Sequence, residues 1–315
     1  MSRGTSAWSN YWASGKASTF GRLDDVDNGA SLVALWQELL SPVSESAVLD
    51  LGCGNGALGQ ILLKIAEEEG ADLEVTGIDS AVISTEIDLP NSLTLIGETE
   101  IEHLPFEEDS FGHIVSQFGF EYADTLGALN EMFRVLRPGG RVTIIGHHRS
   151  AYVCRDSFDI LRQMAEAEES ALMVSVERLL TRLDILYKQG QAPEKDKTAE
   201  DLRKLVNGTV KELEESSKSH PNPGFTLQFL NSVMEVFKTK GASLASHRQY
   251  LQELSESIVD YRIRLDSQKN VALDTSGWQG VKEQFQAQGF QVDRFEPSVV
   301  NGFHFGQLIQ ATKPE

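Results

Sequence analysis

A glycine-rich segment that directly follows a short apolar stretch is the part of the sequence best suited to hold a ligand. The apolar residues 47–51 run into Gly52, Gly54 and Gly56, and a stretch with helical apolar spacing comes next. Glycines at such a turn allow a tight bend and let a ligand approach the main chain closely. About 25 residues later Asp79 ends a second apolar stretch, where a carboxylate accepts hydrogen bonds from both hydroxyls of a ribose. These residues predict a nucleoside-binding site.

Two classes of cofactor fit this loop. Gly52, Gly54 and Ala57 satisfy a loose dinucleotide pattern, so a nicotinamide-dependent oxidoreductase is one interpretation. Asp50 precedes the first glycine by two residues. Its carboxylate would repel a pyrophosphate but suits a ligand that carries an ammonium group. A glycine-rich turn without any ligand is the third interpretation.

Further segments, in a fixed order along the chain, separate these interpretations. They are VLDLGCGNG at 48–56, GID at 77–79, LPFEEDSF at 104–111 and RVLRPGGRV at 134–142. With them the sequence resembles the class I S-adenosylmethionine-dependent methyltransferases, in particular the branch that includes quinone-biosynthesis enzymes. The resemblance covers residues 45–148 and the end of the chain. It implies an α/β fold, a doubly wound Rossmann-like sheet of seven strands with the last strand antiparallel, and S-adenosylmethionine as cofactor.

The resemblance also implies a set of cofactor contacts at the ends of the first four strands. The residues are Gly52, Gly54 and Gly56 along the methionine and ribose, Asp50 at the amino end, Asp79 on the ribose hydroxyls, Ser80 beside the adenine, Glu100 and Ile101 at its amine and ring edge, and Ser116 and Gln117 near the methyl group. One position departs from the family pattern, which usually has an Asp after the Phe of the LPFEEDSF segment, where this chain has Gly112.

Candidate catalytic residues follow the fourth and fifth predicted strands. Ligands bind at the carboxyl ends of strands in open α/β sheets, which places Glu121, His147 and His148 near the reaction. Methyl transfer from a sulfonium mainly requires alignment, and a base is needed only for an acceptor that carries a proton. Histidine titrates near neutrality and could be that base, with at most one of the two side chains facing the pocket. Tyr11, in an aromatic N-terminal segment with Trp12, could cover the cofactor and exclude water.

Alternating apolar stretches predict the order of the elements. The expected strands are 47–51, 73–78, 93–96, 112–116, 141–145, 291–295 and 303–311, with helices at 31–40, 57–69, 125–136 and 278–288. Residues 137–140 predict a turn. The last two strands are joined by too few residues for a crossover helix, so we expect them to be antiparallel neighbours.

The α/β rhythm is interrupted by a long helical segment. We therefore expect an irregular N-terminal arm at 1–30, a cofactor-binding domain at 31–150 and 276–315, and a helical insertion at 151–275. The insertion leaves from the end of the fifth strand, which favours a lid over the substrate, with a homodimer surface as the alternative. Its aromatic residues favour an organic, partly apolar substrate.

Composition excludes several classes of protein. The net charge of −19 makes nucleic acid and anionic membranes poor partners, and no apolar run is long enough to span a bilayer. Two cysteines and no recognisable ligand spacing predict neither a disulfide framework nor a metal site. The sequence therefore predicts a cytoplasmic methyltransferase that acts on a small molecule. The alternatives are a nicotinamide-dependent oxidoreductase and a non-catalytic cofactor-binding or scaffold protein.

Overall fold

The computed structural model describes residues 3–16, 28–84, 86, 88–239 and 242–315, and it divides the chain into two compact units. Residues 1–155 and 267–315 make up the α/β unit, and residues 156–266 make up the helical unit. The chain passes from the first to the second within helix α5 (Tyr152–Glu169) and returns within helix α9 (Leu244–Val271).

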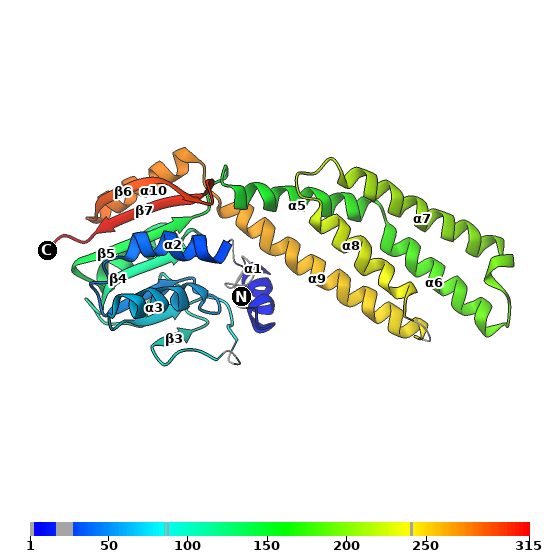
Figure 1. Cartoon of the computed structure of the whole chain (residues 1–315), viewed down its shortest axis with the longest axis horizontal. Helices are drawn as coiled ribbons and strands as arrows, with labels where there is room; N and C mark the ends of the chain where they lie inside the picture. The colour runs from blue at the N-terminus through cyan, green and yellow to red at the C-terminus, as the bar shows by residue number, and fades with distance from the viewer. Residues whose placement is uncertain (1–2, 17–27, 85, 87, 240–241) are drawn as a thin grey trace. The chain divides into compact units, whose positions relative to one another are not determined.

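The α/β unit is built on one seven-stranded sheet with the order β3-β2-β1-β4-β5-β7-β6 (Figure 1). The strands are β1 (Ala47–Leu51), β2 (Glu74–Ile78), β3 (Leu93–Ile96), β4 (Phe111–Gln117), β5 (Leu136–Gly146), β6 (Gln291–Val300) and β7 (Phe303–Thr312). The first five are parallel, and β7 is antiparallel to both of its neighbours. The predicted fold class, including the antiparallel last strand, is confirmed.

The sheet has apolar side chains on both faces, and helices cover each face and bury them. One core lies between the sheet and helices α2 (Asn28–Leu40) and α3 (Ala57–Glu69). The other lies between the sheet and helices α4 (Thr125–Val135) and α10 (Thr275–Gln288). Four residues in a row, Val48 to Leu51 of β1, are buried, so this strand exposes neither face to water, as expected for a central strand of a parallel sheet.

Two sequence-based predictions need correction. Residues 137–140 are not a turn between elements, because β5 begins at Leu136 and the register against β4 shifts across them. Gly139 has a φ of 72°, which lets the segment bulge out and return to the sheet. The expected irregular arm contains helix α1 (Arg3–Ala13), while residues 17–27 of that arm lie outside the described residues.

The helical unit packs helices around a core of its own. Besides parts of α5 and α9 it contains α6 (Leu172–Lys188), α7 (Lys197–Ser217) and α8 (Gly224–Met234), with short 3₁₀ turns η2 (Pro193–Lys195) and η3 (Glu235–Phe237). The buried leucines, valines and phenylalanines of this unit form one cluster. The helical segment was thus predicted correctly from periodicity, whereas its role as a lid or a dimer surface stays a prediction.

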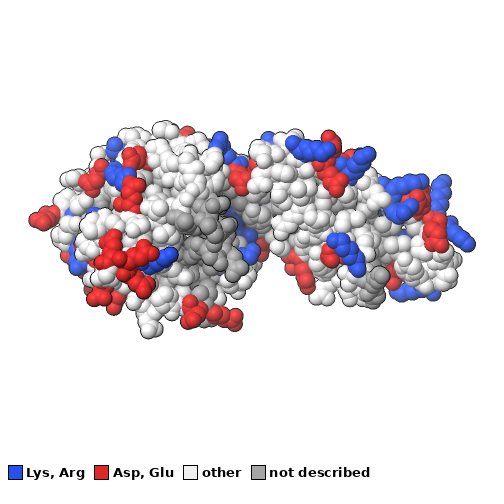
Figure 2. Space-filling model, viewed as in Figure 1, with Lys and Arg blue, Asp and Glu red and all other residues white. Residues whose placement is uncertain are grey.

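Charge is distributed differently over the two units. Figure 2 shows clusters of acidic side chains on the visible face of the α/β unit, whereas acidic and basic side chains lie side by side on the helical unit. Residues 151–275 carry 17 basic and 20 acidic side chains, so most of the net charge of −19 lies outside them. Among the described residues, no helix is both long and apolar enough to cross a membrane.

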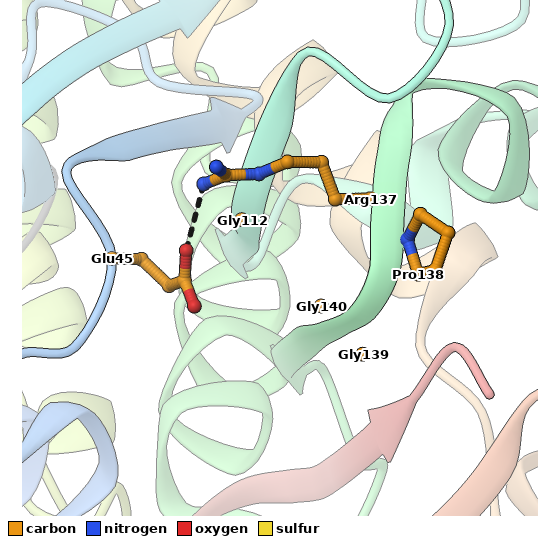
Figure 3. Close-up of a pocket in the computed structure, with 6 residues that line it drawn as sticks. All are labelled: Glu45, Gly112, Arg137, Pro138, Gly139 and Gly140. Carbon is orange, nitrogen blue, oxygen red and sulfur yellow. Dashed lines mark hydrogen bonds and ion pairs between the residues drawn. The ribbon is translucent and has the colours of Figure 1, made fainter. Parts of the chain in front are cut away.

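Gly112, the departure from the family pattern, leaves space that another carboxylate fills. In Figure 3, Glu45 extends toward Arg137 beside Gly112, and its Oε2 lies 2.7 Å from Arg137 Nη2. A Cβ atom added at Gly112 would overlap the carboxylate of Glu45. Glu45 therefore occupies the place that a side chain at position 112 would take, and it pairs with Arg137 from a different segment of the chain.

Because Glu45 fills the space beside Gly112, substitutions at these two positions should have non-additive effects on the free energy of unfolding. Gly112→Asp alone should lower the free energy of unfolding by about 1–3 kcal/mol, because the new side chain overpacks against Glu45. In the double variant with Glu45→Ala, the new Asp gains the space and the guanidinium of Arg137, so at least about 1 kcal/mol should be regained relative to the sum of the single effects. Urea unfolding of the four proteins measures this coupling, and additive effects would contradict it.

Candidate functional site

The glycine loop between β1 and α3 bends so tightly that side chains do not fit at its glycines. Gly52, Gly54 and Gly56 have φ values of 73°, 52° and 82°. A Cβ atom at Gly52 would lie 2.6 Å from the Cα of Gly119, and one at Gly54 would lie 2.5 Å from the ring of Trp12. Both the left-handed backbone and the close packing therefore require glycine here. The loop lies at the carboxyl end of β1, where Cys53, Gly54, Asn55 and Gly56 are buried.

Asp79 holds the glycine loop against the end of β2. One carboxylate oxygen accepts a hydrogen bond from the amide of Gly54 at 2.8 Å, and the other accepts one from the amide of Ala81 at 2.8 Å. Burial raises the pKa of Asp79 above its ordinary value, while the two amide bonds act in the opposite direction. Each carboxylate oxygen has a second lone-pair position, so two hydroxyl donors can still be accommodated.

Asp50 is a buried carboxyl group with an unsatisfied atom. It is 2% exposed in the middle of the sheet, and its Oδ2 has no hydrogen-bond partner among the described residues. Burial, and secondarily the charge of Asp79, raise the pKa of Asp50 to about 8. A buried acceptor without a partner is costly, so a native structure keeps one where a ligand supplies the missing donor.

Helix α1 covers the glycine loop. The side-chain amide of Asn55, within the loop, donates to the carbonyl of Trp12 at 2.9 Å and to that of Lys16 at 2.8 Å. The Trp12 ring lies on Gly54, and Trp8 stacks on Trp12 with centroids 5.9 Å apart. From the sequence, this aromatic segment was predicted to cover a bound cofactor. Its role over a bound cofactor stays a proposal.

Glu121 and His147 form a close pair at the carboxyl ends of β4 and β5. Glu121 lies in the short 3₁₀ helix η1 (Phe120–Tyr122), and its Oε1 is 2.6 Å from His147 Nδ1. The same oxygen accepts a hydrogen bond from the amide of His147 at 2.7 Å. The two side chains are 2% and 6% exposed. The structure therefore brings together two of the three candidate catalytic residues.

His148, the third candidate, faces a different set of side chains. Its ring contacts Thr275 at 3.3 Å and Ser150 at 2.9 Å, and it lies 4.9 Å from the ring of His304. Burial, followed by the charge of His304, lowers the pKa of His148. Adjacent residues at a strand end point in opposite directions, as the sequence analysis expected. His148 is thus separated from the Glu121–His147 pair.

The remaining predicted cofactor residues fall into two groups. Ser116 donates to the carbonyl of Leu51 at 2.7 Å, and Gln117 accepts from the indole of Trp36 at 2.7 Å, so their polar atoms are engaged within the protein. The others lie along the edge of the loop: Ser80 and Glu100 are exposed, Ile101 is 8% exposed, and Tyr11 packs on Trp12 with centroids 4.9 Å apart. Contact of each with a cofactor stays a prediction.

Three residues of the site were missed by the sequence analysis. Asn55 ties α1 to the loop, Phe118 stacks on His147 with centroids 4.3 Å apart, and Trp278 donates from its indole to the carbonyl of His147 at 3.1 Å. Asn55 lies between two glycines of the loop, so a polar side chain at this position was a usable signal in the sequence. Trp278 lies 131 positions from His147 in the chain, and nothing in the sequence pattern connects the two.

Within the described residues, no cluster of three or more side chains with suitable ligand atoms could hold a metal ion.

The family comparison matches the segment that contains the glycine loop, Asp79 and Glu121, but neither His147 nor helix α1. Residues 49–144 match the family described as "Methyltransferase domain". The chain is 33% identical over 104 residues to the ubiquinone/menaquinone biosynthesis C-methyltransferase UbiE of Haemophilus ducreyi, covering 31% of this chain and 40% of that protein. It is 36% identical over 107 residues to the demethylmenaquinone methyltransferase of Listeria monocytogenes, covering 31% of this chain and 43% of that protein. The chain therefore spans less than half the length of these relatives.

A solved structure matches over most of both chains. It is a putative S-adenosylmethionine-dependent methyltransferase from Listeria monocytogenes, at 14% identity and a TM-score of 0.43, covering 91% of this chain and all of that one.

Proposed function

We propose that this chain, whose residues 49–144 form a class I S-adenosylmethionine-dependent methyltransferase domain, transfers a methyl group to a small organic acceptor. The acceptor, the participation of the helical unit and the cofactor contacts of individual residues belong to this proposal. S-adenosylmethionine supplies an electrophilic methyl group on a positively charged sulfur, so the chain itself needs to bind, orient and exclude water.

The observation that carries the proposal is the pair of carboxyl groups beside the glycine loop. Asp79 retains acceptor capacity for the ribose hydroxyls, and the unpartnered Oδ2 of Asp50 suits the ammonium group at the amino end of the cofactor. Gly52 and Gly54 pack on Gly119 and Trp12, so a contact of these glycines with the nucleoside rests on the resemblance. The two carboxyl groups fit the cofactor. A pyrophosphate brings no ammonium group to the unpartnered Oδ2 of Asp50 and would meet the negative charge of Asp79, which disfavours the oxidoreductase alternative.

Calorimetry with S-adenosylhomocysteine is the direct test of this function. We expect binding by the full chain and none of comparable strength by NADH, followed by turnover of S-adenosylmethionine with an acceptor. A chain that does not bind S-adenosylhomocysteine at millimolar concentration contradicts the proposal. A chain that binds it, but turns over no cofactor with a metabolite extract, favours the non-catalytic alternative. A cytoplasmic location, the absence of a nucleic-acid partner and dimerisation through the helical unit remain predictions.

A further inference from the structure

The Glu121–His147 pair favours one proton arrangement. His147 Nδ1 lies 2.6 Å from Glu121 Oε1, although no hydrogen bond with acceptable angles forms at this nitrogen. A carboxylate this close favours a proton over a lone pair on Nδ1, which in the neutral ring leaves the free lone pair on Nε2. The carboxylate of Glu121 also stabilises the positive charge that the ring acquires when Nε2 takes up a proton.

The ring of His147 is held in place on several sides. It stacks on Phe118, and the ring of Tyr122 lies edge-on at 6.1 Å. Its backbone carbonyl accepts hydrogen bonds from the indole of Trp278 and the amide of Leu273, both at 3.1 Å. A fixed ring directs its free nitrogen in one direction, which is what a general base requires.

The pair is attached to the glycine loop. Gly119, which precedes η1, packs directly on Gly52. A Cβ atom added at Gly52 would lie 2.6 Å from the Cα atom of Gly119. Ser116 fixes this contact, because its hydroxyl donates to the carbonyl of Leu51 and accepts from the amide of Phe120. Glu121 is therefore two residues from Gly119, which contacts the loop that is proposed to hold the methyl donor.

A second observation concerns the other oxygen of Glu121. Glu121 Oε2 is buried and has no hydrogen-bond partner among the described residues. An unsatisfied buried acceptor costs free energy, so this oxygen is poorly explained by a purely structural contact. The charge left on Glu121 is instead available to stabilise a cation that forms beside it.

We propose that His147 is the general base of the reaction and Glu121 its positioning residue, and that the acceptor is an acidic, phenol-like hydroxyl group. This inference rests on the proposed function and specifies its substrate class. The acceptor's O–H bond breaks and its proton goes to Nε2 of His147. The electron pair left on oxygen forms the bond to the methyl carbon, while the methyl–sulfur bond breaks and its pair remains on sulfur.

The choice of hydroxyl follows from the strength of the base. A phenolic hydroxyl, with an ordinary pKa of about 10, loses its proton to an imidazole far more readily than an alkyl hydroxyl, which is nearly as weak an acid as water. An aromatic thiol is largely ionised near neutrality, and a neutral amine has a free lone pair, so neither acceptor needs the base. The aromatic side chains of Phe118 and Tyr122 beside His147 suit an apolar, ring-sized acceptor.

Three probes that share one ring system test the proposal: 2-naphthol, 2-naphthylamine and 2-naphthalenethiol. We expect the full chain to methylate 2-naphthol, and His147→Gln to lower that rate about 100-fold or more, the usual size of general-base catalysis. The rates with the thiol and with the amine should each stay within about threefold, because neither nucleophile needs the base. Affinity for S-adenosylhomocysteine should be unchanged, which shows that the variant is folded. His304→Gln is the matched control and should leave all rates unchanged.

Nitrogen NMR of the labelled imidazole rings gives a readout that does not depend on turnover. In the free protein, the neutral ring of His147 should carry its proton on Nδ1, and Glu121→Gln should abolish this preference as well as lower the rate with 2-naphthol. A proton on Nε2, an unchanged rate in His147→Gln, or binding of S-adenosylhomocysteine without methylation of 2-naphthol would each overturn the inference and leave the proposed function standing. Failure to bind S-adenosylhomocysteine would remove both.

Discussion

Replacing Asp79 with alanine should weaken the binding of S-adenosylhomocysteine at least about 100-fold. A carboxylate that accepts hydrogen bonds from two ribose hydroxyls contributes about 1.5–3 kcal/mol for each bond, and about 2.7 kcal/mol corresponds to this factor. The variant also removes the acceptor that holds the amide of Gly54 at 2.8 Å, so the glycine loop loses its link to β2. Calorimetric titration of the full chain measures the effect.

A second variant separates these two contributions. Asp79→Asn keeps one acceptor oxygen for the amide of Gly54 or of Ala81 but loses the charge and half of the acceptor capacity. We expect an intermediate loss of affinity, about 10-fold, with little change in unfolding. Glu74→Gln, at the exposed beginning of the same strand, is the control and should bind like the unmodified chain. Unchanged affinity in Asp79→Ala would remove the basis for placing the nucleoside at this loop.

The strands and helices near the glycine loop could be predicted because their apolar patterns are complete within a few residues. The limits of β1, α3 and β3 agree with the expected ones, since a buried strand and an amphipathic helix are each encoded locally. The RPGG segment was misassigned for the opposite reason. Its Pro and Gly signal a turn, but the pairing of β5 with β4 and β7 continues the strand on either side of the bulge.

The sequence indicates candidate residues for the site but not the contacts between them. Strand alternation correctly separates His147 from His148, whereas the partner of each side chain depends on segments far apart in the chain. The same holds for Glu45, which fills the space at Gly112 from 67 positions away and was not considered from the sequence. Contacts of this kind arise from the packing of the sheet and its loops, and a single sequence holds no local signal for them.

Binding of S-adenosylhomocysteine near pH 7 should release a proton from Asp50. The pKa of Asp50 is raised to about 8 in the free protein, so its carboxyl group is mostly protonated at pH 7. An ammonium group next to the unpartnered oxygen favours the charged form and lowers that pKa, and the proton leaves. Calorimetry in buffers of different ionisation enthalpy should therefore report the release of up to about one proton per ligand. The release should fade above pH 8, where Asp50 is already ionised without ligand.

The same shift fixes how stability depends on pH in the free protein. Because the folded pKa of Asp50 lies above its ordinary value of 3.8, the native state binds more protons than the unfolded state between about pH 4 and pH 8. The contribution of Asp50 to stability is thus complete below pH 4 and is lost as the pH rises through 8. Asp50→Asn removes this dependence, so thermal unfolding of the variant should vary less over this range and the variant should be the more stable protein at pH 8.

Two controls tie the released proton to this one contact. 5′-Methylthioadenosine shares the nucleoside but has no ammonium group, so it should bind without releasing a proton. Asp50→Asn should bind S-adenosylhomocysteine without release, because its amide does not titrate. Equal release by the variant, or by the ligand without the ammonium group, would show that another group titrates and that Asp50 does not face the amino end of the cofactor. Release that requires both the carboxyl group and the ammonium group places the two side by side, and with them the reactive end of the nucleoside at the loop that carries Gly119 and η1.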